Sequence, residues 1–273
     1  MSARLSVVDL GRRPYADVLE LQRALCRQRM AGERHEDLLL LVEHEPVVTL
    51  GRGTRATSLP LAPAELARRG LEVAEVERGG DVTYHGPGQL VGYPVLDLRE
   101  HREDLHWYLR QLEAGLLTAL AALGVPAERS PGRTGVWTRG RKIASLGIHV
   151  KQWVTFHGFA LNVSTDLSAF ELIVPCGIDG VVMTSVAAEL GRGDAAVLWD
   201  ETREAVVTAF GETFGYEAVG RVTAGLLADV ESVSGSGSVS ASPSLRSGQA
   251  PQARDPLHGA RAIPGQGPSL RSG

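Results

Sequence analysis

Lysine and asparagine are nearly missing from this chain of 273 residues. Only two of its 28 basic residues are lysines, Lys142 and Lys151, and Asn162 is its single asparagine. Because arginine keeps its proton near neutral pH whereas a lysine can be tuned to lose it, each remaining lysine is a candidate for proton chemistry. Chance survival on a solvated face is the alternative, and we favour it for Lys151, which lies in a polar segment.

Long apolar runs, basic clusters and a cysteine framework are also missing. The longest aliphatic run, Leu38 to Val42, is far shorter than the ~20 residues of a membrane span, and residues 1–10 lack the pattern of a secretory signal. The net charge of −4 provides no basic field for nucleic acid. Two cysteines suit a reducing compartment. We therefore expect a cytoplasmic protein without nucleic-acid or membrane partners, and a monomer.

Apolar periodicity predicts helices and strands that are mixed without strict alternation. Helices are expected over residues 15–30, 64–69, 104–123 and 200–214, with Asp200 as the N-cap of the last. Strands are expected over residues 5–10, 38–42 continued by 47–50, 71–77, 90–98, 135–138, 143–150 and 156–163. This pattern predicts an α/β (α+β) fold of mixed sheets with packed helices.

The composition changes toward the C-terminus, where serine, glycine, proline and alanine dominate. Such a segment buries too little apolar surface to offset its ordering entropy. We expect residues 1–220 to form one folded domain and residues 221–273 to be a largely disordered tail. A partner-binding arm is the alternative for the tail.

Residues 78–89 form a glycine-rich segment. Its four glycines and one proline let backbone amides approach a ligand closely. Arg78 adds a cationic fork suited to a phosphate or carboxylate, and Thr83, Tyr84 and His85 add hydroxyl and imidazole groups. A glycine-rich hairpin with a satisfied histidine is the alternative interpretation.

Two further segments contain candidate functional residues: one is centred on Lys142 and the other on Cys176. Lys142 begins a predicted strand after a tight turn, and Ser145 and Gly147 leave room beside that strand. Cys176 lies between a proline and a glycine, which predicts a loop or sharp turn with an accessible sulfur. Cys26 falls at helical spacing with two leucines and fits a core position. Because a cationic neighbour raises the thiolate fraction of a thiol, Cys176 beside Lys142 is the candidate nucleophile.

Five segments together resemble one family. Residues 78–93, Arg-Gly-Gly-x-x-Thr-Tyr-His-Gly-Pro-Gly-Gln-x-x-x-Tyr, look like the signature of the lipoyl(octanoyl) transferases. Residues 142–147 (Lys-Ile-Ala-Ser-Leu-Gly), 158–163 (Gly-Phe-Ala-Leu-Asn-Val) and 174–178 (Val-Pro-Cys-Gly-Ile) match further motifs of that family, and residues 43–46 (Glu-His-Glu-Pro) resemble an early one. The resemblance covers roughly residues 5 to 217, and the tail has no counterpart in it.

The resemblance implies a fold like the catalytic domains of biotin and lipoate protein ligases, and an octanoyltransferase domain over residues 1–220. It implies transfer of an octanoyl group from octanoyl-acyl-carrier-protein to a lysine on lipoyl domains of 2-oxoacid dehydrogenase complexes or on the glycine-cleavage H protein, the first step of endogenous protein lipoylation. The donor is already activated, so no ATP, cofactor or metal is expected.

The same resemblance assigns roles to residues. Cys176 becomes the acyl-thioester nucleophile and Lys142 its proton partner. The implied substrate-binding positions are Arg78, Gly79, Gly80, Asp81, Val82, Thr83, Tyr84, His85, Ser145, Leu146, Gly147, Gly158, Phe159 and Ala160.

Two other functions are compatible with such a fold. An ATP-dependent lipoate or biotin ligase would activate its acid as an adenylate and would need no cysteine, so the Pro-Cys-Gly setting of Cys176 argues against it. A non-catalytic protein that binds acyl carrier protein or a lipoyl domain would form no covalent adduct, and the pairing of Lys142 with Cys176 argues against that.

Overall fold

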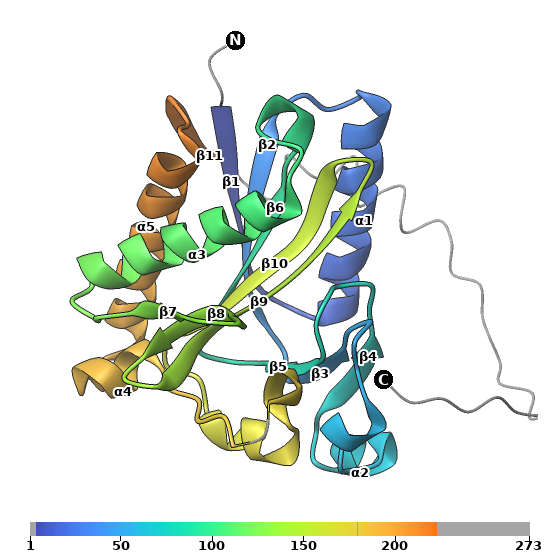
Figure 1. The fold of residues 1–273 in the computed structure, drawn as a ribbon, viewed down its shortest axis with the longest axis vertical. Coiled ribbons are helices and arrows are strands. Elements are labelled where there is room, and N and C mark those ends of the chain that lie inside the picture. The colour runs from blue at the N-terminus through green and yellow to red at the C-terminus, as the bar shows by residue number, and fades with distance from the viewer. Residues whose placement is uncertain (1–3, 179, 223–273) are drawn as a thin grey trace, which may run out of the picture. The chain divides into compact units, whose positions relative to one another are not determined.

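The computed structural model describes residues 4–178 and 180–222, so nearly all of the predicted tail, 221–273, lies outside the described residues. Within the described residues, eight strands form one mixed sheet in the order β11-β1-β2-β6-β10-β9-β8-β7 (Figure 1). β1 pairs in parallel with β2 and β11, and the other neighbours pair antiparallel. The strands are β1 (Arg4–Arg13), β2 (Asp37–His44), β6 (Gln89–Val95), β7 (Glu128–Ser130), β8 (Arg133–Thr138), β9 (Arg141–Lys151), β10 (Val154–Asn162) and β11 (Ala218–Val222).

Strand β2 lies in the middle of this sheet and is buried on both faces, as its continuous apolar run predicted. Successive side chains of a strand point to opposite faces. Leu39 and Leu41 accordingly enter one hydrophobic cluster, and Leu38, Leu40 and Val42 enter another.

Three long helices cover these two faces (Figure 1). Helix α1 (Tyr15–Ala31) contributes to the cluster of Leu38, and it ends at Gly32 in the left-handed conformation that terminates many helices. Helices α3 (Leu105–Ala122) and α5 (Ala195–Phe214) pack on the opposite face. The carboxylate of Asp104 caps α3 by accepting from the amides of His106 and Trp107.

The predicted start of the last helix is wrong. Helix α5 begins at Ala195, not after Asp200, because its first turn carries Leu198, which is fully buried against the core. Asp200 therefore lies inside the helix, where it forms an ion pair with Arg203. Tertiary burial of one leucine outweighed the local capping signal.

A smaller sheet of three strands, in the order β4-β3-β5, lies beside the large one. It consists of β3 (Val47–Leu50), β4 (Glu72–Glu75) and β5 (Val82–His85). The prediction that residues 47–50 continue the strand 38–42 is wrong, because the chain changes sheets after Pro46, which has no amide hydrogen for a ladder. Residues 82–85, for which no strand was predicted, pair as a strand with β3.

Shorter elements complete the described chain. They are α2 (Pro63–Arg68), α4 (Val186–Leu190) and the 3-10 turns η1 (Ala56–Ser58), η2 (Leu98–Glu100), η3 (Leu167–Leu172) and η4 (Pro175–Gly177). Strand β11 runs past the predicted domain boundary at residue 220 because it pairs with β1. No helix in residues 4–178 and 180–222 has the length and apolarity to cross a bilayer.

Candidate active site

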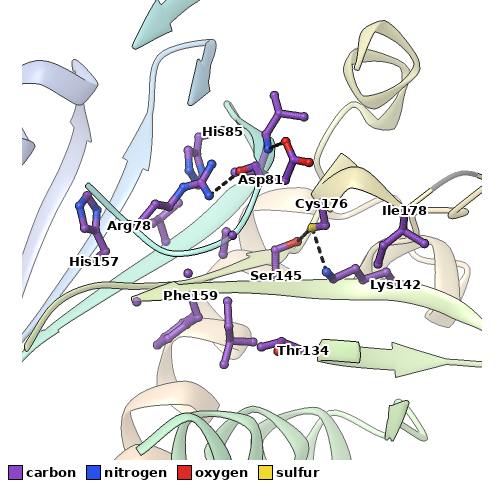
Figure 2. A pocket seen from close by; sticks show the side chains of 18 of the residues that line it. Arg78, Asp81, His85, Thr134, Lys142, Ser145, His157, Phe159, Cys176 and Ile178 are labelled. Carbon is purple, nitrogen blue, oxygen red and sulfur yellow. Dashed lines mark hydrogen bonds between the residues drawn. The ribbon is translucent and has the colours of Figure 1, made fainter. Parts of the chain in front are cut away.

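The segments predicted to carry the chemistry meet around one cavity of about 330 Å³. Its wall is built from α1, the glycine-rich loop, strands β5, β6, β8, β9 and β10, and the cysteine turn η4. Figure 2 shows Lys142, Ser145 and Cys176 toward one end, and His85, Arg78 and His157 toward the other. The cavity therefore joins a reactive end to a second, polar end.

Lys142 and Cys176 lie in direct contact at the reactive end. The ammonium Nζ of Lys142 donates to Sγ of Cys176 at 3.0 Å. The hydroxyl of Ser145 lies 3.9 Å from the same sulfur. This contact confirms the prediction that the thiol and the amine meet in space, although the two residues lie 34 positions apart in the sequence.

The position of Lys142 follows from its backbone. It is the second residue of β9, after a turn in which Arg139 and Gly140 both have positive φ. Its amide donates to the carbonyl of Val182, and its carbonyl accepts from Thr184. This short parallel bridge fastens the segment that follows the cysteine turn to the strand that carries the lysine.

The side chain of Lys142 occupies a fitted slot. It is only 1% exposed, passes close to Gly135, and places Nζ 5.6 Å from the centre of the Trp137 ring. Within the described residues no carboxylate forms an ion pair with it. The amine of Lys142 therefore faces an aromatic ring and the cysteine sulfur.

Cys176 lies in a strained turn. Its φ is 58°, a conformation that costs a non-glycine residue about 1–2 kcal/mol. Gly177 follows with φ 63° and packs so tightly that a Cβ there would lie 2.3 Å from Oδ2 of Asp81. Strain of this kind persists only where the surroundings hold the backbone in place.

The surroundings of the turn hold it through several hydrogen bonds. Arg55 donates to the carbonyl of Gly177 at 2.9 Å. The amide of Val174 donates to the carbonyl of Ser58 at 2.9 Å, and the hydroxyl of Ser58 donates to Asp81 at 2.7 Å. Asp81, expected to bind substrate, lines the cavity and also anchors the cysteine turn.

Arg78 lines the cavity, but its guanidinium is occupied by the protein. Its nitrogens donate to the carbonyl and hydroxyl of Thr49 and to the carbonyls of Gly79 and Asp81, at 2.6 to 3.3 Å. In this arrangement Arg78 holds the glycine-rich loop instead of presenting a free fork to an anion. Burial lowers the pKa of Arg78 from its ordinary value.

The rest of the glycine-rich segment divides between the cavity and the smaller sheet. Gly80, Val82, Thr83 and His85 line the cavity. Tyr84 points to the opposite face of β5 from Thr83 and His85 and packs against the ring of Phe170 instead. Gly79 uses its amide to bind the carbonyl of Ile148. The implied positions on β9 and β10 all line the cavity, namely Ser145, Leu146, Gly147, Gly158, Phe159 and Ala160.

Sequence motifs did not assign the other wall residues, which are Tyr15, Val91, Tyr93, Gly132, Arg133, Thr134, His157 and Ile178. Three of them carried a usable signal, because Tyr93 closes the glycine-rich signature, Ile178 closes the cysteine motif, and His157 directly precedes the Gly158 motif. The others come from segments whose contribution depends only on the fold.

Two neighbouring groups at the polar end of the cavity, His85 and Tyr15, are uncharged. The ring of Tyr15 stacks on that of His85 at 5.8 Å, and His85 contacts the amide oxygen of Gln89 at 2.8 Å. Burial lowers the pKa of His85 well below its ordinary value and raises the pKa of Tyr15 to about 12. Both groups are therefore neutral near pH 7.

Within the described residues, no cluster of three or more histidine, cysteine, aspartate or glutamate side chains could hold a metal ion. Both cysteines have free thiols, and burial raises the pKa of the Cys26 thiol to about 11. Cys26 lies on the core-facing side of α1, as its helical spacing predicted.

Comparison with known proteins identifies a matching family and close relatives of this chain. The family described as the lipoyl protein ligase A/B catalytic domain matches residues 14–211. An octanoyltransferase of Gloeobacter violaceus is 49% identical over 214 residues, which are 78% of this chain and 92% of that protein. One from Geobacter sulfurreducens is 50% identical over 206 residues, which are 76% and 83% of the two chains.

Solved structures show the same fold at lower identity. A lipoate-protein ligase A bound with ATP has a TM-score of 0.67 and 19% identity, over 85% of this chain and 92% of that one. A bipartite lipoate protein ligase from Thermoplasma acidophilum has a TM-score of 0.64 and 18% identity, over 85% and 90%. From the family match and the relatives, this chain belongs to the octanoyltransferase family and is an acyltransferase of lipoate biosynthesis.

Proposed function

We propose that this chain takes an octanoyl group from octanoyl-acyl-carrier-protein onto Cys176 as a thioester and passes it to the lysine of a lipoyl domain. The observation that supports this most directly is the 3.0 Å contact between Lys142 Nζ and Cys176 Sγ at the wall of a cavity. The acceptors we expect are lipoyl domains of 2-oxoacid dehydrogenase complexes and the glycine-cleavage H protein. The free thiols suit a reducing compartment such as the cytoplasm.

The first step exchanges one thioester for another. Lys142 takes the thiol proton, and the Cys176 thiolate attacks the carbonyl carbon of the donor. A carbon–sulfur bond to Cys176 forms, the bond to the carrier's sulfur breaks, and Lys142 returns the proton to the departing thiolate. Because the same bond type is made and broken, this step is close to thermoneutral and reversible.

The second step forms an amide. The acceptor lysine attacks as a neutral amine, and Lys142, which is neutral after releasing its proton to the carrier, takes the proton that the attacking nitrogen loses as the amide forms. A carbon–nitrogen bond forms, the bond to Cys176 breaks, and the proton passes to the cysteine sulfur. An amide is more stable than a thioester, so this step drives transfer forward. Backbone amides near the cysteine turn or the glycine-rich loop would stabilise the oxyanion of both steps.

The cavity offers an apolar path for the acyl chain. Val82, Val91, Leu146, Phe159 and Ile178 contribute to its wall. At roughly 0.8 kcal/mol for each buried methylene, six methylenes provide on the order of 5 kcal/mol of binding. Each missing carbon should therefore weaken donor binding by a factor of about four.

Intact-mass spectrometry after incubation with octanoyl-acyl-carrier-protein tests the proposal. We expect one octanoyl adduct on the wild-type protein, none on Cys176→Ser, and the full adduct on the matched control Cys26→Ala, because Cys26 is a core thiol. An undiminished adduct on Cys176→Ser would defeat the assignment. Octanoate activation by ATP that survives Cys176→Ser would instead favour a ligase.

A further inference from the structure

One histidine at the polar end of the cavity has three features that normally destabilise a folded protein. His157 lies in the middle of β10 with φ 58°, it is 1% exposed, and among the described residues neither of its ring nitrogens has a hydrogen-bond partner. Buried polar groups normally have a partner, and a left-handed non-glycine residue inside a strand is strained. Such an accumulation points to a function at this position.

The surrounding residues hold His157 in place. Its amide donates to the side-chain oxygen of Gln22 on α1 at 2.8 Å. Its Nε2 lies 3.7 Å from Oε2 of Glu77, a contact longer than a hydrogen bond. Arg23 fixes the other oxygen of Glu77 at 2.6 Å, and the ring of Phe156 stacks on the imidazole at 4.9 Å. The imidazole is therefore a fixed part of the cavity wall.

The strand register gives the backbone separation between Ser145, which lies beside the nucleophile, and this histidine. Ser145, which contacts the cysteine sulfur, pairs with Ala160, and His157 pairs with Ile148 three residues farther along β9. At about 3.3 Å per residue, three residues span about 10 Å. Seven carbon–carbon bonds of about 1.5 Å in a zigzag give an extended octanoyl chain a length of about 9 Å. The two lengths agree.

The wall changes character along that distance. Between the ends lies the register pair of Gly147 and Gly158, which line the cavity without adding a side chain to it. At the far end the wall turns polar, with His157 beside Tyr93, whose ring centre lies 6.4 Å away. A ninth or tenth carbon would have to displace the imidazole, which the stacked ring of Phe156 and the hydrogen bond from the backbone amide to Gln22 hold in place.

We propose that His157 closes the far end of the acyl site and limits the transferred chain to about eight carbons. This inference rests on the proposed function, since it presumes that an acyl chain on Cys176 extends into the cavity. His157 then acts as a specificity determinant that leaves the proton chemistry of Lys142 and Cys176 unaltered.

The test compares carrier-protein thioesters of six, eight, ten and twelve carbons by the kcat/KM of acyl-enzyme formation. In the wild type we expect a steep fall beyond eight carbons. His157→Gly, which accepts the positive φ, should raise the decanoyl-to-octanoyl ratio by up to about 16-fold, since each of the two additional buried methylenes is worth a factor of about four. The matched control is His149→Ala, which removes an imidazole that contacts the carbonyl of Glu77 but lies outside the cavity wall, and its ratio should stay within twofold.

Three results separate the possibilities. Equal kcat/KM for octanoyl and dodecanoyl in the wild type would overturn the inference without any variant. If His157→Gly does not fold, His157→Asn, whose smaller side chain tolerates the left-handed conformation, takes its place, and an unchanged ratio in a folded variant overturns the inference. If the wild type accepts no acyl chain on Cys176, the proposed function itself fails.

Discussion

Gly135 offers a sharp test of how closely the lysine must fit. It lies on β8 with φ 129°, and a Cβ at this position would lie 2.7 Å from Cε of Lys142 and 2.8 Å from the carbonyl oxygen of Ala144. Carbon atoms in ordinary contact are about 3.5–4.0 Å apart. Gly135→Ala therefore requires the lysine side chain to move by about 1 Å. The backbones of β8 and β9 must also move apart slightly, because the carbonyl belongs to the strand ladder.

The size of the effect follows from that displacement. A misplacement of about 1 Å in a catalytic group can lower the rate on the order of 100-fold, and overpacking a core site typically lowers the free energy of unfolding by about 1–3 kcal/mol. We expect Gly135→Ala to fold and to form the acyl-enzyme on the order of 100-fold more slowly. Single-turnover mass spectrometry measures the rate, and urea denaturation measures the unfolding free energy.

Gly140→Ala is the matched control for backbone strain. Gly140 also has positive φ, at 74°, but a Cβ there would meet nothing within 4 Å. This variant should lose some stability and keep its rate of acylation within threefold. If Gly135→Ala also acylates within threefold of the wild type, the argument that the slot positions Lys142 is refuted.

Two further predictions follow from buried groups. Lys142→Arg keeps the charge, but arginine is larger and cannot release its proton, so we expect a loss of transfer activity of at least 100-fold in a steady-state assay, and near-normal turnover would exclude lysine from the proton chemistry. Burial lowers the pKa of His44 from 6.5 to about 4, so the unfolded chain takes up a proton before the folded one does. The contribution of His44 to stability is present above pH 6.5 and is lost as pH falls to about 4, by on the order of 3 kcal/mol. Urea denaturation between pH 7 and 4.5 should show a shallower loss in His44→Gln than in the exposed control His35→Gln, and identical slopes would contradict the assignment.

Local patterns predicted most elements of this fold. The periodicity of residues 15–30 and the continuous apolar run of residues 38–42 correspond closely to α1 and β2, because burial of one or both faces is written directly into the spacing of apolar residues. The predictions were wrong where contacts between residues far apart in the sequence determined the structure. Val47–Leu50 joined a second sheet through pairing with β5, and α5 began early because Leu198 reached the core.

The sequence by itself determined which groups this protein has for chemistry: one cysteine in a proline–glycine turn, one lysine at a strand start, and a glycine-rich segment beside them. Only the tertiary structure decided that Lys142 and Cys176 touch, that Arg78 holds the loop, and that His157 faces the far end of the cavity. The physical reason is that residue spacing encodes which face of an element is buried. The meeting of residues 34 positions apart depends instead on strand pairing and loop closure across the whole domain.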